Sequence, residues 1–220
     1  MRHLKVFGMQ RTGTTFAMET MNLNLLATTA HNNEFGHKHS KPLTAEEMLL
    51  WAIFEADKMH RKDWEEIKER KLSPIIIIKN PYSWFRSIES WGKVAWAPGY
   101  STEKAYSDWN KKYAWWKDLL ENPRTPFGKG VILKYEDLIR DVGSEMMRIA
   151  SILQLEGVWD PITTPKQVDQ SAPFTEERRM YYLDSSQHFG LFPQERKKIT
   201  KLVDWDLMKY YGYEASYSNS

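Results

Sequence analysis

Leu-Lys-Val-Phe-Gly-Met-Gln-Arg-Thr-Gly-Thr-Thr-Phe, residues 4–16, is the stretch that decides the fold of this chain. Its apolar start predicts a short buried strand, and Gly8 and Gly13 predict a glycine-bounded turn that leads into a helix. Two glycines that bracket four residues also have the spacing of a nucleotide-binding P-loop. In such a loop a lysine follows the second glycine and reaches the β- and γ-phosphates, but here that position is Thr14 and the cation, Arg11, lies inside the loop. The stretch therefore predicts a phosphate-binding loop without the residue that handles a triphosphate.

The residue types of this loop suit an anion. Backbone N–H groups at the start of a helix, together with the positive end of its dipole, bind phosphate. The hydroxyls of Thr12, Thr14 and Thr15 add donors, and the Arg11 guanidinium can donate two parallel hydrogen bonds to a phosphate or sulfonate. A strand-to-helix turn that binds nothing is the alternative.

Strands alternate with helices along the rest of the chain. Four consecutive isoleucines, residues 75–78, have no polar face and indicate a central parallel strand that is covered on both sides. The sequence predicts strands at 4–7, 74–78 and 131–135, and a segment, 28–39, that begins as a strand and ends in a loop. It predicts helices at 14–26, 44–70, 82–94, 102–120, 137–154 and 193–211, and irregular structure at 161–173. We therefore expect one domain over residues 1–220, a three-layer α/β/α fold with a central parallel sheet. Ligands of such sheets bind at the carboxyl ends of the strands.

The composition is that of a soluble globular protein. The formal net charge of +2 is too small to indicate a nucleic-acid partner, and there is no cysteine for disulfides or metal thiolates. No apolar run approaches the ~18 residues that span a bilayer, and the first predicted strand leaves no room for a signal peptide. We expect a soluble cytoplasmic protein. The 10 tryptophans are unusual, and those between residues 84 and 116 predict either a large-residue core or an aromatic wall for an acceptor.

A second polar cluster follows the isoleucine strand. Lys79 ends that strand, Pro81 suits a first helical turn, and Ser87 lies eight residues after Lys79 on the next helix. A lysine and a serine on the same side can hold a second phosphate. Tyr135 ends the last predicted strand, at the same edge of the sheet.

With these motifs the chain resembles the sulfotransferases that use 3′-phosphoadenosine 5′-phosphosulfate (PAPS). Their phosphosulfate loop reads Lys-Ser-Gly-Thr-Thr-Trp, and residues 11–16 occupy the same frame. Their 3′-phosphate motif is Arg-Asn-Pro with a serine eight residues after the arginine, which residues 79–87 match with lysine first. Tyr-Glu-Asp at 135–137 and the His-Lys-His of 37–39 are also similar to segments of these enzymes, and the ending at 208–213 resembles the close of many compact members of the family.

The resemblance implies a nucleotide site. The loop amides of residues 12–15 would hold the 5′-phosphate, Lys79 and Ser87 the 3′-phosphate, and Phe16 and Tyr135 would flank the adenine. No metal would be needed, because the donor carries no polyphosphate. The Arg-Lys-Gly loop that covers the nucleotide in cytosolic members is missing. The basic pairs at 178–179 and 197–198 are either its replacement or parts of solvated helix faces.

The resemblance also implies catalytic roles. His39 would be the general base, with His37 or Glu34 as alternatives, and Arg11 and Lys38 would stabilise the transferred sulfonate. His31, His37 and His39 with Glu34 also form a possible metal cluster, although no further ligand is evident.

The expected activity is transfer of a sulfonate from PAPS to a hydroxyl or amine of a small-molecule or carbohydrate acceptor. Residues 155–195 match no motif and are expected to form a substrate or lid segment. A P-loop kinase, which would leave the spacing of Lys79 and Ser87 as coincidence, and a non-catalytic nucleotide-binding protein of the same fold are the alternatives.

Overall fold

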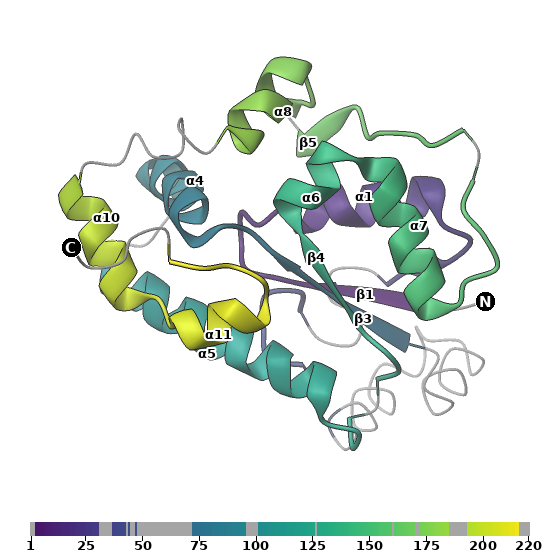
Figure 1. The fold of residues 1–220 in the computed structure, drawn as a ribbon, viewed down its shortest axis with the longest axis horizontal. Coiled ribbons are helices and arrows are strands. Elements are labelled where there is room, and N and C mark those ends of the chain that lie inside the picture. The colour runs from purple at the N-terminus through teal and green to yellow at the C-terminus, as the bar shows by residue number, and fades with distance from the viewer. Residues whose placement is uncertain are drawn as a thin grey trace.

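Four parallel strands form the centre of the molecule in this computed structural model (Figure 1). Their spatial order is β2-β1-β3-β4, where the strands are β1 (His3–Phe7), β2 (Thr28–Thr29), β3 (Leu72–Ile78) and β4 (Val131–Lys134). The structure describes residues 3–30, 37–42, 44, 47, 72–95, 101–125, 127–159, 161–169, 172–184 and 193–215. The parallel sheet and its central isoleucine strand are as predicted.

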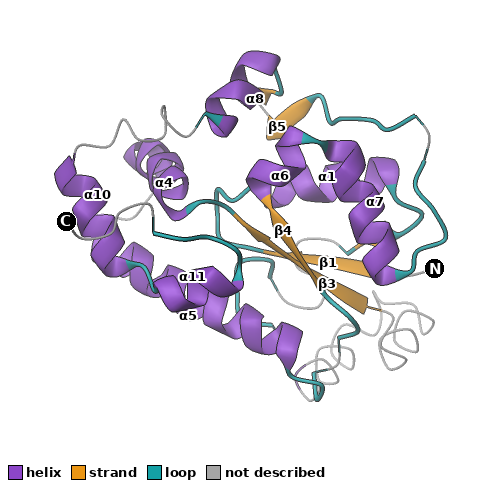
Figure 2. Cartoon of the chain, in the orientation of Figure 1, coloured by secondary structure: helices purple, strands orange, loops and turns teal. Residues whose placement is uncertain are grey.

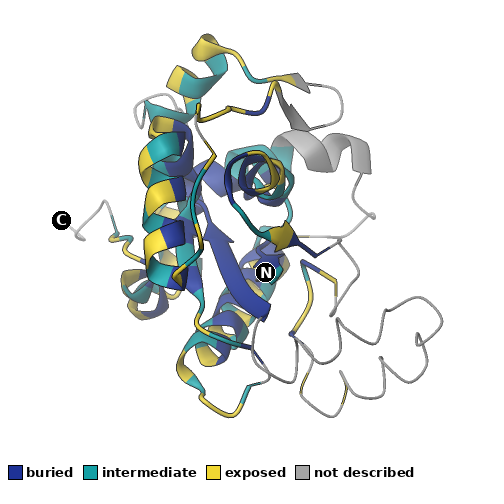
Figure 3. Cartoon of the chain, turned by 90° about the vertical axis from the view of Figure 1, so that its right-hand side faces the viewer, coloured by how far each residue is buried: buried dark blue, intermediate teal, exposed yellow. Residues whose placement is uncertain are grey.

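The isoleucine strand has no solvent-exposed face. Every residue of β3 is buried, and Figure 3 shows the central strands in the dark blue of buried residues. Ile75 and Ile77 belong to one apolar cluster, whereas Ile76 and Ile78 belong to the other. The alternation of side chains along a strand thus places one cluster on each face of the sheet.

Helices cover both faces of the sheet, as Figures 1 and 2 show. One layer contains α1 (Thr14–Asn24), α6 (Tyr135–Arg140) and α7 (Val142–Leu153). The other contains α4 (Pro81–Ala95), α5 (Thr102–Glu121), α10 (Pro193–Leu202) and α11 (Trp205–Tyr210). A peripheral helix, α8 (Glu176–Leu183), packs against α6. The α/β/α class expected from the sequence is confirmed. None of the helices within the described ranges is long and apolar enough to cross a membrane.

Two helices that the sequence predicts as continuous are divided. The predicted helix 137–154 is interrupted at Asp141, whose carboxylate accepts a hydrogen bond from Ser144 N at 2.9 Å. The predicted helix 193–211 stops before Asp204, which in the same way accepts from Leu207 N at 2.9 Å. In both places an aspartate caps a new helix although the apolar pattern continues across the break.

Two smaller expectations also change. The strand predicted within 28–39 is only two residues long, Thr28–Thr29, and residues 31–36 of that segment lie outside the described part. Residues 161–173 contain an antiparallel pair, β5 (Gln167–Asp169) and β6 (Ala172–Pro173). The body of the helix predicted at 44–70 lies outside the described residues, but its capping box is present: Glu47 Oε2 accepts from Thr44 N at 2.7 Å and Thr44 Oγ1 from Glu47 N at 3.2 Å.

The tryptophans of α4 and α5 belong to the core. Trp84, Trp109 and Trp116 are fully buried in the cluster that covers one face of the sheet. For these three the interpretation as an acceptor wall is therefore wrong. The side chain of Trp91 and the whole of Trp96 lie outside what the structure describes.

Candidate functional site

The loop between β1 and α1 requires both of its glycines. Gly13 has φ +87°, and a Cβ there would lie 2.3 Å from the Tyr135 ring. A Cβ on Gly8 would lie 2.6 Å from Ile77 Cγ2. Arg11 also has a positive φ of 66°, a conformation that costs a non-glycine residue of order 1 kcal/mol and that clusters at functional sites. The close approaches explain the glycine spacing, and the strained backbone places Arg11 within the loop.

Two contacts hold the loop from inside the protein. The amide and the hydroxyl of Thr12 both donate to the Met9 carbonyl, at 3.2 and 2.6 Å. The Trp84 indole N–H, from α4, donates to the Gln10 carbonyl at 2.8 Å. Thr12 is fully buried, so its hydroxyl shapes the turn and does not face a ligand as the sequence suggested.

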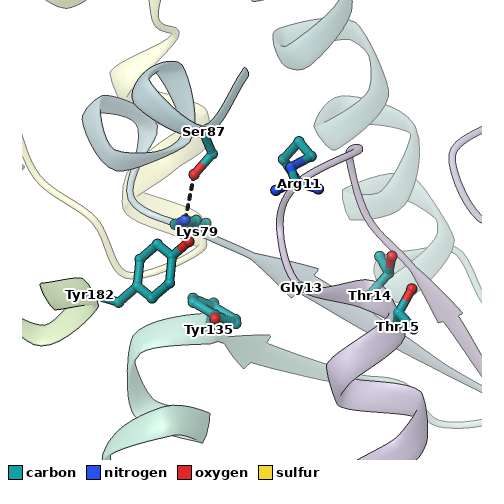
Figure 4. Close-up of a pocket in the computed structure, with 8 residues that line it drawn as sticks. All are labelled: Arg11, Gly13, Thr14, Thr15, Lys79, Ser87, Tyr135 and Tyr182. Atoms are coloured by element: carbon teal, nitrogen blue, oxygen red, sulfur yellow. Dashed lines mark hydrogen bonds between the residues drawn. The ribbon is translucent and has the colours of Figure 1, made fainter. Parts of the chain in front are cut away.

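The two predicted phosphate motifs meet at one pocket of about 90 Å³ (Figure 4). Its lining comes from the β1–α1 loop, the end of β3, α4, α6 and α8. The residues are Arg11, Gly13, Thr14, Thr15, Lys79, Ser87, Tyr135 and Tyr182. All of these except Tyr182 were expected at the site from the sequence.

Lys79 is a buried cation between a hydroxyl and two aromatic rings. Its ammonium donates to Ser87 Oγ at 2.8 Å and lies 5.1 Å from the Tyr135 ring centroid and 4.1 Å from that of Tyr182. Burial lowers the pKa of Lys79 to about 7, the charge of Glu136 opposes this shift and that of Arg11 adds to it. The pocket thus contains one permanent cation and one whose charge depends on its surroundings.

Glu136 fixes the turn that follows β3. Its Oε1 accepts from Asn80 N at 2.8 Å, and its Oε2 accepts from the Tyr213 hydroxyl at 2.6 Å. This carboxylate belongs to the Tyr-Glu-Asp motif of residues 135–137. The sequence alone indicated no role for Glu136.

Residues 37–39 lie against the loop but do not line the pocket. Gly8 N donates to the Lys38 carbonyl at 3.0 Å, and the Lys38 ammonium donates to Thr15 Oγ1 at 3.2 Å. His39 Nδ1 lies 2.6 Å from the Gly8 carbonyl, which can only accept, so Nδ1 carries the proton and Nε2 keeps the lone pair. Burial lowers the pKa of His39 to about 4; the hydrogen bond to the Gly8 carbonyl opposes this shift and the charge of Lys38 adds to it.

The alternative bases are placed differently. His37 is exposed, and its Nδ1 accepts from His39 N at 3.3 Å. Burial and the charge of Lys38 lower its pKa as well. Glu34 and His31 lie outside the described residues. Within the described part of the chain, no three His, Asp or Glu side chains are grouped so as to hold a metal ion.

Phe16 is fully buried beneath the site. Its ring packs against Phe174 at 4.8 Å and Tyr135 at 6.4 Å, measured between centroids. Phe174 and Tyr182 both belong to the segment 155–195, which no motif explained. Their contacts depend on where β6 and α8 lie in the fold, and no local sequence pattern indicates them.

The sequence matches no protein-family model and no curated protein. Among solved structures it is similar to an Arabidopsis thaliana protein provisionally described as a steroid sulphotransferase. The TM-score is 0.40 with 17% identity, over 100% of this chain and 79% of the other. At this level of similarity we argue the function of the site from its own geometry.

Proposed function

We propose that this protein is a sulfotransferase that transfers a sulfonate from PAPS to a hydroxyl or amine of an acceptor. The observation that carries the proposal is the shared pocket, in which the Lys79–Ser87 pair faces the Arg11 loop and the start of α1. Two separate cationic positions suit a nucleotide with single phosphates at two places better than a polyphosphate chain. The residue after Gly13 is Thr14, so the lysine of a triphosphate-binding loop is missing.

The first turn of α1 supports the phosphate role. The first N–H groups of a helix have no partner inside it, and no side chain caps the helix at Gly13. These amides would hold the 5′-phosphate, and Lys79 and Ser87 the 3′-phosphate. A volume of about 90 Å³ is below the 300–1,000 Å³ typical of ligand pockets, so the pocket holds the phosphates while the adenosine and the acceptor extend beyond it.

The residues that would carry out the transfer are His39, Arg11 and Lys38. His39 Nε2 takes the proton of the acceptor as the acceptor oxygen or nitrogen forms its bond to sulfur. The sulfur–oxygen bond to the 5′-phosphate breaks, and 3′-phosphoadenosine 5′-phosphate (PAP) leaves with the electron pair. Arg11 and Lys38 stabilise the charge on the sulfonate and on the leaving oxygen. Arginine cannot give up a proton at neutral pH, so the role of Arg11 is electrostatic.

Isothermal titration calorimetry with PAP tests the proposal. We expect PAP to bind without Mg²⁺ and ATP with Mg²⁺ not to bind. The opposite result would support the kinase alternative. Transfer from radiolabelled PAPS to a panel of phenols, sugars and amines then tests catalysis, and binding of PAP without any transfer would indicate a non-catalytic nucleotide-binding protein.

A further inference from the structure

Helix α8 presents a tyrosine to the pocket although the helix itself is loosely packed. None of its residues is fully buried, and its main neighbour is α6. Thr175 caps the helix, accepting from Arg178 N at 3.2 Å. Tyr182 lines the pocket near the end of the helix, while its neighbour Tyr181 is 42% exposed. One of two adjacent tyrosines is thus directed into the site.

The Tyr182 ring lies against the Lys79 ammonium. Figure 4 shows Ser87 on one side of Lys79 and the rings of Tyr135 and Tyr182 on the other. Tyr182 is the nearer ring, at 4.1 Å against 5.1 Å, and it meets Tyr135 edge-on at a centroid distance of 5.5 Å. A cation over an aromatic face is attracted by the ring quadrupole, more strongly where water is excluded.

We propose that Tyr182 is a specificity-determining residue that makes the pocket select a nucleotide with a 3′-phosphate. This inference rests on the proposed function of the same site. The ring holds the ammonium beside Ser87 and keeps water from it, so the cation meets a phosphate at short range. A nucleotide without a phosphate at that position gains nothing from Lys79, and its affinity should not depend on Tyr182.

The test compares PAP with AMP, which lacks the 3′-phosphate, by isothermal titration of the full chain. In Tyr182→Leu we expect the preference for PAP over AMP to fall about tenfold, with AMP affinity unchanged. Tyr182→Phe keeps the aromatic ring and should retain most of the preference for PAP over AMP. Met180→Leu, at an exposed residue of the same helix, is the control and should leave the preference at the wild-type value.

A double-mutant cycle separates a specific contact from a structural one. In a Lys79→Met background, replacing Tyr182 should no longer change PAP affinity. If circular dichroism shows that Tyr182→Leu does not fold, Tyr182→Met takes its place. Equal losses for PAP and AMP, or an unchanged preference, would overturn the inference alone. A wild-type protein that does not bind PAP would instead overturn the proposed function.

Discussion

Lys79 is the residue of the site whose charge depends most on its neighbours. In the sulfotransferases that the sequence resembles, the corresponding residue is an arginine, which remains charged at any physiological pH. The groups that face it are Glu136 and Tyr135 of α6, Tyr182 of α8, Ser87 of α4 and Arg11 of the loop. Burial outweighs the carboxylate, and the pKa of Lys79 falls to about 7.

PAP affinity should therefore fall as the pH rises through about 7. Lys79 is charged below its pKa and neutral above it, so the attraction to the 3′-phosphate is lost on the alkaline side. Titrations between pH 7 and 9, where the phosphates of PAP are already ionised, measure this loss. Lys79→Arg should bind with nearly constant affinity over that range, and a wild-type affinity that is equally constant would contradict the prediction.

His39 should control the rate rather than nucleotide affinity. Replacing a general base by alanine typically lowers kcat by about 10²-fold or more, and we expect this for His39→Ala with PAP affinity retained. Because the pKa of His39 is about 4, the base is unprotonated at neutral pH. The value of kcat should therefore fall only as the pH drops through about 4. Steady-state rates across pH check this.

His37→Ala is the companion variant of that experiment. His37 is exposed and its ring lies 5.1 Å from that of His39, so its replacement should change kcat much less. A larger loss of rate in His37→Ala than in His39→Ala would transfer the role of base to His37.

Helix α4 supports the loop as well as providing Ser87. Trp84→Phe removes the indole N–H that holds the Gln10 carbonyl and should weaken PAP binding several-fold, at a cost of about 1–3 kcal/mol in stability. Trp109→Phe is the matched control, because Trp109 is equally buried and its indole nitrogen has no hydrogen-bond partner in the described structure. Calorimetry and thermal unfolding compare the two variants, and equal losses of PAP affinity would show that the Trp84 hydrogen bond is unimportant.

Elements with a local signal could be predicted from the sequence, and contacts between distant elements could not. The loop glycines and the isoleucine strand follow from spacing and periodicity within a few residues. The break at Asp141 was missed because the apolar pattern runs through it. Tyr182 was missed because its role requires α8 to lie beside α6, and Thr12 was assigned to the ligand because its burial cannot be seen in the sequence.

At the scale of the whole molecule, the two apolar clusters share the sheet that both of them cover. Phe7 and Ile76 face one cluster and Val6 and Ile77 the other, so β1 and β3 serve both. The C-terminal segment ties one helical layer to the site, since the Tyr213 hydroxyl donates to Glu136 Oε2 of α6 at 2.6 Å. This arrangement predicts that both layers unfold together.

Leu153→Ala tests that cooperativity. Leu153 is fully buried in the cluster of α1, α6 and α7, and its truncation should cost about 2–5 kcal/mol. The fluorescence of the protein comes from 10 tryptophans, of which Trp84, Trp109 and Trp116 are fully buried in the opposite cluster. If the shared strands couple the clusters, denaturant transitions followed by fluorescence and by far-UV circular dichroism should move together.

Leu23→Ala, at a residue 45% exposed on α1, is the control and should change stability by no more than about 0.5 kcal/mol. A fluorescence transition that stays in place while the dichroism transition shifts would mean that the sheet does not couple the layers, and that the site between them lies on a boundary between separately folding parts.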